Sequence, residues 1–282
     1  LIAPLRPPGI GLFVYGCIAN VAFGKLFVAV FGPGVLLCAT MMFMVSRISK
    51  KRGYLPLRTE KMHPSMFWKS FRPAVLPLCL PIIIIGGVRL GVFTATEAGS
   101  VAIVYAAILG IVYRELGFKE IAQGLKETLQ TTSSIMLIVA AASTFSWILT
   151  KEMIPQRFTE WMIQMINNKW IFLVAVDIFL IFVGMFVEGN ASMIVLVPLF
   201  APAAAAYGID PIHFAMVFIF ANAIGAFTPP MGTLMFVACG VTKCPTRDFI
   251  KEAAPFYALL FGCLLILTFV PLFSTGLVNL VY

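Results

Sequence analysis

The hydropathy pattern divides the chain into long apolar runs separated by short polar and basic segments. Runs at residues 24–45, 73–93, 98–113, 128–149 and 253–273 are long enough, or nearly so, for helices that cross a bilayer. Hydrophobic residues make up 61% of the 282 residues and charged residues 11%. A water-soluble domain of this length could not hide so much apolar surface. The pattern therefore predicts an all-α integral membrane protein with several spans.

Basic residues mark the side of the membrane on which each loop is expected. Eight of the twenty Lys and Arg residues fall between Arg47 and Arg72. Positive residues accumulate in short cytoplasmic loops, so this segment and the loops 114–127 and 242–252 are predicted to be cytoplasmic. The net charge of +8 is thus attributed to topology and not to nucleic-acid binding. Within the basic segment, residues 61–69 form either a short helix on the membrane surface or a plain solvated loop.

Polar residues interrupt two of the apolar stretches near the C-terminal end. In 170–207, Glu188-Gly189-Asn190 separates two arms of roughly 16–18 residues, slightly short for full spans. They form either a hairpin that enters and leaves on one side or two short spans. In 213–240, the break is Thr228-Pro229-Pro230-Met231-Gly232-Thr233. Consecutive prolines remove two backbone donors and clash with the preceding turn, so the helix must stop there.

The double-proline break offers oxygen atoms to a cation. Carbonyls freed around residues 225–228 need partners, because lipid provides none, and sodium is a hard ion satisfied by carbonyl and hydroxyl oxygens. Thr228 and Thr233 add hydroxyls, while Gly225 and Gly232 permit close backbone approach. The half-helix after Pro230 would aim its N-terminal amides at the break and favour an anionic group.

The other interruption carries Glu188, Asn190 and Ser192. Polar groups at membrane depth are costly and are functional candidates, although a simple loop at the surface is the alternative. Further charges in apolar segments are Arg89, Glu97 and Asp177. The first two either pair or lie near an interface, and a structural role is favoured for them.

Two segments match each other at a constant offset of 222 residues. Pro7-Pro8 matches Pro229-Pro230, Cys17 matches Cys239, and Pro33 matches Pro255. The basic loops predict that the last helices of the two copies run in opposite directions. An inverted repeat with interrupted helices indicates a secondary transporter with its site at the repeat interface. The alternative is an ordinary bundle with proline kinks.

Motifs for catalysis or nucleotide-driven transport are missing from the sequence. It has no HExxH, Walker A or complete GxGxxG pattern, no CxxC pair among its six Cys, and only two His. The chain is therefore not expected to be an enzyme, to hold zinc or to use ATP.

At its double-proline segments the chain resembles the large membrane subunit of TRAP (tripartite ATP-independent periplasmic) transporters, the DctM-like family. The matching stretches are residues 7–16, 24–27, 86–98 and 184–236. The family has a Ser/Gly-rich first hairpin before the first double proline, which this chain lacks. Its first break reads Arg6-Pro7-Pro8-Gly9 where the family usually has Pro-Pro-Ser. The chain is accordingly expected to lack its N-terminal part.

The resemblance implies a set of site residues. Sodium would be bound, mostly by backbone oxygen, at Gly184, Gly225, Thr228 and Met231, and no other cofactor is implied. Substrate or hairpin-tip positions would be Glu188, Gly189, Asn190, Ser192, Pro229, Pro230, Gly232 and Thr233, with Pro7, Pro8 and Gly9 as the first-repeat counterpart.

The resemblance also implies an architecture and partners. It implies an elevator-type transporter of the bacterial inner membrane that imports a C4-dicarboxylate, sialic acid or sugar acid with sodium. A periplasmic binding protein would deliver the substrate, and a small membrane subunit would complete the transporter. The expected division is 1–45 (end of the first repeat), 46–72 (basic cytoplasmic arm), 73–149 (scaffold), 150–240 (second-repeat hairpin and broken helix) and 241–282 (final loop and span). The competing interpretations are a membrane pore and a truncated, non-functional permease fragment.

Overall fold

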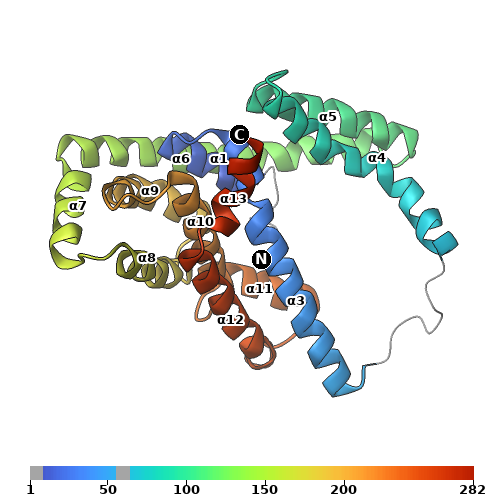
Figure 1. Ribbon diagram of the computed structural model, residues 1–282. Helices are drawn as coiled ribbons and strands as arrows, with labels where there is room; N and C mark the ends of the chain where they lie inside the picture. The colour runs from blue at the N-terminus through green and yellow to red at the C-terminus, as the bar shows by residue number, and fades with distance from the viewer. Residues whose placement is uncertain (1–8, 55–63) are drawn as a thin grey trace. The chain divides into compact units, whose positions relative to one another are not determined.

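The computed structural model describes residues 9–54 and 64–282, which form helices joined by short turns (Figure 1). The predicted all-α class is confirmed, since no strand occurs in these two ranges. The helices are α1 (Ile10–Ala19), α2 (Phe23–Ala29), α3 (Phe31–Arg52), α4 (Pro64–Arg89), α5 (Ala95–Val112), α6 (Phe118–Lys151), α7 (Ile154–Met165), α8 (Lys169–Gly184), α9 (Gly189–Ala206), α10 (Pro211–Phe227), α11 (Thr233–Thr242), α12 (Thr246–Phe269) and α13 (Leu272–Val281).

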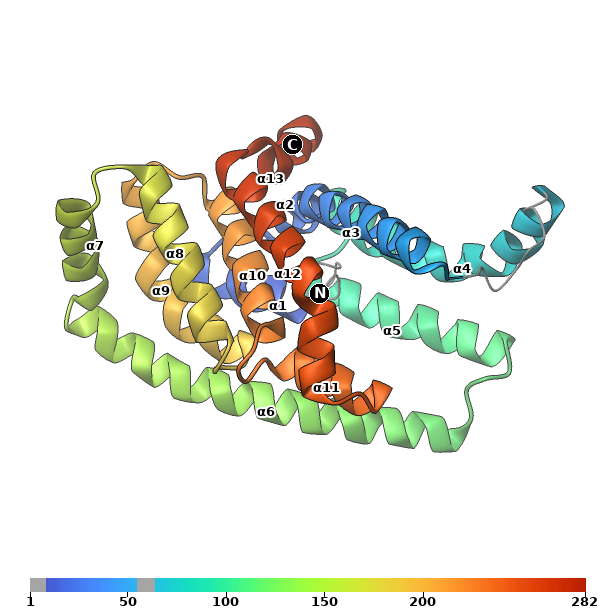
Figure 2. The same ribbon diagram turned by 90° about the horizontal axis from the view of Figure 1, so that it is seen from below.

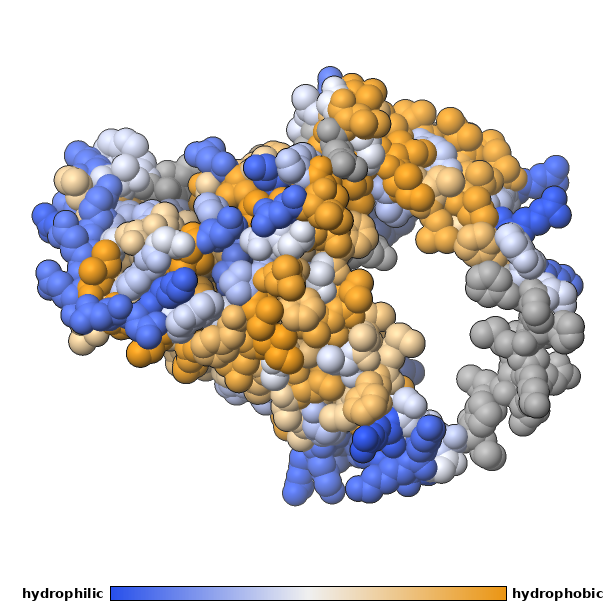
Figure 3. Space-filling view, viewed as in Figure 1, coloured by the Kyte–Doolittle hydropathy of each residue, from blue (hydrophilic) through white to orange (hydrophobic). Residues whose placement is uncertain are grey.

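Several helices have the length and composition of membrane spans. Within the described ranges, four candidates qualify: Phe23–Arg52, Phe71–Val88, Gly189–Ala206 and Thr246–Phe269. A fifth arises if α7 and α8, which meet at 120°, form one broken span or a re-entrant loop. Figure 3 shows apolar residues over the middle of α12 and hydrophilic residues gathered where α12 begins. Such apolar surface is what a bilayer covers.

The chain divides into two compact units. Unit 1 comprises Leu1–Ile48 and Ile138–Tyr282, and unit 2 comprises Ser49–Leu137. In unit 2, α4 and α5 pack as an antiparallel pair. The Tyr113 hydroxyl donates to the Pro73 carbonyl at 3.1 Å, and the Tyr105 hydroxyl donates to the Leu76 carbonyl at 2.8 Å. Pro77 has no amide hydrogen to donate to the Pro73 carbonyl, as the residue at this position would in a regular helix. The Tyr113 hydroxyl replaces that missing hydrogen bond.

Glu97 has a structural role at the start of α5. Its carboxylate accepts from the Thr94 amide at 2.7 Å, while the Thr94 hydroxyl accepts from the Glu97 amide at 3.3 Å. This reciprocal capping box places a negative charge at the positive end of the helix. The side chain of Arg89 is outside what the structure describes, so its pairing with Glu97 stays a prediction.

Several helices begin or end away from their predicted positions. In the basic segment, α3 continues to Arg52 and α4 begins at Pro64, so Trp68 lies in the first turns of a long helix and not in a loop or a separate surface helix. Residues 55–63 of that segment lie outside the described ranges. The expected loop 114–127 is largely helical, because α6 already begins at Phe118. Helix α12 likewise begins inside the expected loop 242–252. In each case polar helix-forming residues extend an apolar span.

Helices α8, α9 and α10 form the centre of unit 1 and lie side by side (Figure 2). Tyr207, just after α9, stacks on Phe172 in the first turn of α8, with ring centroids 4.5 Å apart. At the other end, Gly184 and Gly189 both lie against Asn222 of α10. The two arms therefore run antiparallel, with their connection beside Asn222. Helix α10 is buried on every side from His213 to Ala226, as a central helix must be.

The structure supports the internal repeat but changes the offset at which the helices of the two copies align. Helices α1 and α11 each have ten residues and end in a left-handed residue, Asn20 and Lys243, both with φ of 53°. Leu12 and Met235 are fully buried at equivalent positions. These pairs are 223 residues apart, whereas the double prolines align at 222.

The two copies also run in opposite directions. Gly32 near the start of α3 packs against the carbonyl of Phe273, just beyond α12. Thr40 further along α3 lies beside Cys263 of α12, with hydroxyl and thiol 3.3 Å apart. Position rises along α3 as it falls from Phe273, at the start of α13, to Cys263 in α12, so α3 runs antiparallel to this segment. The inverted relation predicted from the basic loops is thus present in the fold.

Candidate functional site

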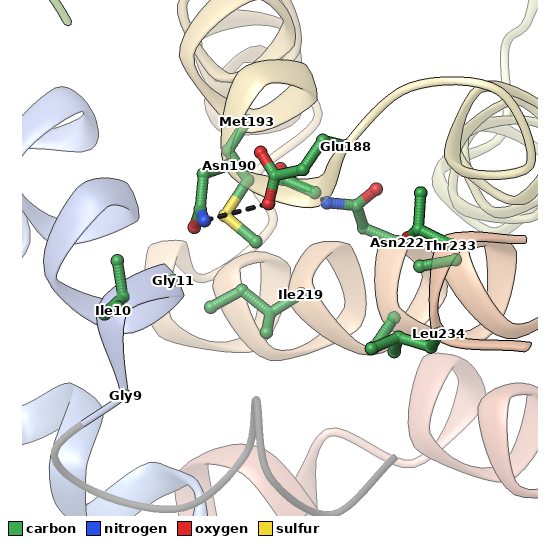
Figure 4. Close-up of a pocket in the computed structure, with 13 residues that line it drawn as sticks. Gly9, Ile10, Gly11, Glu188, Asn190, Met193, Ile219, Asn222, Thr233 and Leu234 are labelled. Carbon is green, nitrogen blue, oxygen red and sulfur yellow. Dashed lines mark hydrogen bonds between the residues drawn. The ribbon is translucent and has the colours of Figure 1, made fainter. Parts of the chain in front are cut away.

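The breaks of the chain converge on one pocket of about 280 Å³. It is lined by the first turn of α1, the first turn of α9, the second half of α10 and the first turn of α11 (Figure 4). Three helix N-termini therefore open toward the same space. Because N-terminal amides lack intrahelical partners and carry partial positive charge, their convergence suits an anionic group. The lining residues are Gly9, Ile10, Gly11, Glu188, Gly189, Asn190, Met193, Ile219, Asn222, Ala223, Ala226, Thr233 and Leu234.

Asn222 joins the hairpin tip to α10. Its amide nitrogen donates to the Gly189 carbonyl at 2.9 Å, and its amide oxygen accepts from the Ser192 hydroxyl at 2.9 Å. The side chain is only 1% exposed, so both bonds are shielded from water. Low dielectric strengthens such bonds and makes their loss costly. The tip of the hairpin is consequently fixed to the helix that carries the double-proline break.

Glu188 caps the start of α9. One carboxylate oxygen accepts from the Ala191 amide at 3.0 Å, and the other accepts from the Asn190 side chain at 2.9 Å. Both oxygens are therefore engaged by the tip itself. Figure 4 shows the Glu188–Asn190 bond beside the pocket. The negative charge of Glu188 is offset by the helix N-terminus that it caps.

Gly184 and Gly225 bring α8 and α10 into backbone contact. A Cβ on Gly225 would lie 2.8 Å from the Gly184 Cα and 2.6 Å from the Ile181 carbonyl oxygen. A Cβ on Gly184 would lie 2.9 Å from the Asn222 carbonyl oxygen. Only glycine at both positions permits this approach. Backbone carbonyls of two helices are thereby brought to one place.

Thr228 lies directly after the end of α10, next to Gly225 of the same cluster. Its amide donates to the Gly225 carbonyl at 2.9 Å, and its hydroxyl donates to the Ile224 carbonyl at 2.7 Å. With its hydrogen directed at Ile224, the hydroxyl keeps its lone pairs for another partner, which is the arrangement a cation ligand needs. The side chain is 8% exposed.

The sequence-predicted residues separate into two neighbouring groups. Gly9, Glu188, Gly189, Asn190 and Thr233 line the pocket. Gly184, Gly225 and Thr228 form the buried backbone cluster described above.

The remaining predicted residues lie at the edges of these groups. Ser192 lies behind the tip on Asn222, and Gly232 begins α11 close to the Thr228 carbonyl. Pro229, Pro230 and Met231 form the connection between α10 and α11, where the Met231 side chain is 58% exposed and leaves its backbone as the candidate donor of oxygen. Pro7 and Pro8 lie outside the described residues.

Asn222 was not anticipated from the sequence. The available signal was a single amide side chain inside the apolar helix sequence Phe220-Ala221-Asn222-Ala223-Ile224, one turn before Gly225. A polar residue in such a run is costly unless it has a partner. Within the described ranges, no group of three or more His, Cys, Asp and Glu side chains gathers as a metal site.

An all-α membrane protein in which an inverted repeat and a hairpin tip meet at a pocket belongs to a small class of folds, the inverted-repeat membrane proteins. The profile described as "Tripartite ATP-independent periplasmic transporter, DctM component" matches residues 1–273. The chain therefore belongs to the DctM family of these transporters. It is a multi-pass protein of the bacterial inner membrane.

Several characterised relatives are similar along almost all of the chain. It is 37% identical over 275 residues to a sialic acid TRAP transporter large permease protein of Vibrio cholerae. It is 36% identical over 283 residues to a C4-dicarboxylate TRAP transporter large permease protein of Pseudomonas aeruginosa, and 33% identical over 276 residues to a 2,3-diketo-L-gulonate TRAP transporter large permease protein of Escherichia coli. These alignments cover 97%, 98% and 96% of the chain and 64% of each relative, so the chain spans a little under two thirds of their length.

Proposed function

We propose that the chain is the membrane permease subunit of a secondary transporter that imports an organic acid together with sodium. The substrate class is a C4-dicarboxylate, a sialic acid or a sugar acid. The names of the relatives support this range, because each is a permease for an acid that carries a carboxylate. The role is transport and not catalysis.

The observation that carries the proposal is the convergence of interrupted helices on the pocket. The N-termini of α1 and α11, equivalent elements of the two inverted copies, both line it. Their amides favour a carboxylate, while Asn190, Asn222 and Thr233 supply neutral hydrogen-bonding groups around it. A bound organic acid would touch both copies at once, so movement of one copy relative to the other would change access to the acid.

Sodium is proposed to bind beside the pocket, at the cluster of Gly184, Gly225, Thr228 and Met231. The cluster is built from backbone carbonyls and one hydroxyl, the ligand type that a hard cation prefers. Asn222 and Ala226, which flank Gly225 in the sequence of α10, line the pocket, so cation and acid would be neighbours. Their opposite charges would favour binding together, which is the basis of coupling.

Partners follow from the same proposal. A small membrane subunit would cover apolar helix surface, and a periplasmic binding protein would deliver the acid to the permease. Helix α5 of unit 2 exposes Ile103, Val104, Ile108 and Ile111, which need lipid or another helix in place of water. The hairpin and broken helix would move as the transport domain of an elevator, with 73–149 as scaffold.

Uptake into lipid vesicles tests the proposal. Vesicles containing the chain with its small subunit and delivery protein should accumulate a labelled organic acid, with saturation, when sodium is outside. Passive conductance without saturation would favour the pore, and uptake that ignores sodium would contradict the coupling. Correctly folded chain that binds neither acid nor sodium would favour a non-functional fragment.

A further inference from the structure

A second polar cluster lies inside unit 1, away from the pocket. It joins Asp177 of α8, His213 of α10, Thr268 of α12 and Ser274 of α13, none of which is more than 3% exposed. The Thr268 hydroxyl oxygen lies 2.7 Å from Asp177 Oδ2 and 2.8 Å from the Leu264 carbonyl oxygen. The other carboxyl oxygen, Asp177 Oδ1, is buried and has no hydrogen-bond partner among the described residues.

If Asp177 is ionised, the Thr268 hydroxyl is the one hydrogen-bond donor that its carboxylate has among the described residues. The Thr268 hydroxyl has one hydrogen and lies within bonding distance of two acceptors. An ionised Asp177 would then hold a full charge between apolar helices with at most one hydrogen bond, an arrangement with a large desolvation cost. A proton on Oδ2 removes this charge, and Oδ2–H can then donate to Thr268 while Thr268 donates to Leu264.

No neighbouring cation replaces that proton within the part of the chain that the structure describes. Helix α8 packs against α9, α10 and α12, and the only hydrogen-bond partner of Asp177 in those ranges is Thr268. His213 of α10 faces the cluster, but its ring nitrogens lie 3.2 Å from the Ser274 hydroxyl and 3.2 Å from the Thr268 carbonyl.

The other titratable groups on these elements lie at the helix ends or against other partners. Lys169 begins α8, Asp210 and Glu188 cap α10 and α9, and Cys263 contacts Thr40. Tyr257 donates to the Phe227 carbonyl, and α12 has its charged residues at its start: Arg247, Asp248, Lys251 and Glu252. Glu252, the last of these charged residues, is roughly 24 Å from Thr268 along the axis at the rise of an α-helix.

We propose that Asp177 is a proton-binding site that links the first arm of the hairpin to α12. With the proton bound, Asp177 donates to Thr268 and Thr268 donates to Leu264, so no full charge remains between the helices and α8 is held against α12. Releasing the proton leaves an unpaired charge between them, so release requires that the two helices separate or that water enters. The site lies two turns from Gly184 along α8 and is distinct from the proposed sodium cluster. It does not depend on which acid is transported.

Infrared difference spectroscopy on the whole chain in lipid at neutral pH tests this proposal. Subtracting the spectrum of Asp177→Asn from that of the wild type should leave the carbonyl band of a protonated carboxylic acid. Asn keeps a donor toward Thr268 and nearly the same shape, so the variant should fold. Asp210→Asn is the control, since it removes an exposed carboxylate that accepts from two backbone amides. Its difference spectrum should contain carboxylate bands and the bands of the new Asn amide, with no band of a protonated carboxylic acid.

Carboxylate bands in the Asp177→Asn difference, with no acid band, would overturn the proposal. Thr268→Val provides a second reading that leaves Asp177 in place. It removes the hydroxyl partner and should shift the acid band without abolishing it. An infrared spectrum of Thr268→Val that matches the wild type throughout the acid region would also overturn the proposal.

Discussion

The hydroxyl of Thr40 lies 3.3 Å from the thiol of Cys263, and the two positions are 223 residues apart. The same separation relates the caps of α1 and α11, Asn20 and Lys243. In two antiparallel copies, equivalent positions touch only where the two-fold axis passes between them. Thr40 and Cys263 therefore mark the axis of the inverted repeat. The N-termini of α1 and α11, which are equivalent in the two copies, both line the pocket.

A disulfide tests this crossing of α3 and α12. In Thr40→Cys, the new thiol should lie close enough to native Cys263 to form a bond under mild oxidation, since side-chain atoms already approach to 3.3 Å. Mass spectrometry after alkylation should identify the linked peptides. Thr40→Cys combined with Cys263→Ser should show no such link. A Thr40→Cys chain that remains fully alkylated would contradict the antiparallel arrangement.

Asn222 should be the most sensitive polar side chain at the hairpin tip. Asn222→Leu removes the bonds to Ser192 and Gly189, and the Ser192 hydroxyl then keeps only the Gly189 carbonyl, 2.9 Å away, as its partner. The expected loss is about 0.5–1.5 kcal/mol of unfolding free energy for each of the two hydrogen bonds. The thermal unfolding midpoint of purified protein in detergent measures the effect. Ser192→Ala removes the hydroxyl but keeps the bond from Asn222 to the Gly189 carbonyl, so it should lower the midpoint less. Equal midpoints for the wild type and Asn222→Leu would show that the tip is not held by this side chain.

Gly225→Ala should force α8 and α10 apart. The added methyl would lie 2.6 Å from one backbone oxygen and 2.8 Å from the Gly184 Cα, and neither is a flexible side-chain end. Overpacking of this kind costs about 1–3 kcal/mol, and the same shift should abolish sodium-dependent uptake. Gly240→Ala is the matched control, since a methyl there meets nothing within 4 Å and helix propensity improves. Active Gly225→Ala protein would argue against close approach of the two helices.

Thr228→Ala should weaken sodium dependence more than it lowers protein abundance. It deletes one oxygen without disturbing the prolines, and losing a ligand worth about 1.4 kcal/mol raises the half-saturating sodium concentration about tenfold. Uptake measured over a sodium titration provides the value. Thr242→Ala is the control, because its hydroxyl makes the same bond to a preceding carbonyl, Ala238, at an exposed site. If the half-saturating sodium concentration is the same for the wild type, Thr228→Ala and Thr242→Ala, then Thr228 is not a ligand of the cation.

The sequence predicted where the helices must break, but not how the breaks are joined. Two prolines cannot continue a helix, and Glu188-Gly189-Asn190 interrupts an apolar run, so both breaks follow from local chemistry. Asn222 and Ser192 are 30 residues apart, and Asp177 and Thr268 are 91 apart. Such pairs depend on packing that no local pattern specifies.

Register and helix ends were also beyond the sequence pattern. The double prolines align at 222, while the helices after them align at 223, since α1 begins two residues after Pro8 and α11 begins three residues after Pro230. The polar residues that extend a span, such as those in the first turns of α6 after Phe118 and of α12 after Thr246, resemble loop residues in composition. Helix ends were consequently misplaced where charged helix formers flank the membrane.

Sodium binding to the purified chain tests the central claim most directly. The thermal unfolding midpoint should be recorded in sodium chloride and in potassium chloride of equal ionic strength, for the wild type and for Thr228→Ala. A ligand at a hundred times its dissociation constant stabilises the folded state by about 2.7 kcal/mol. A midpoint that rises with sodium in the wild type, and much less in Thr228→Ala, is the predicted result. Identical midpoints in the two salts would contradict a sodium site at the double-proline break.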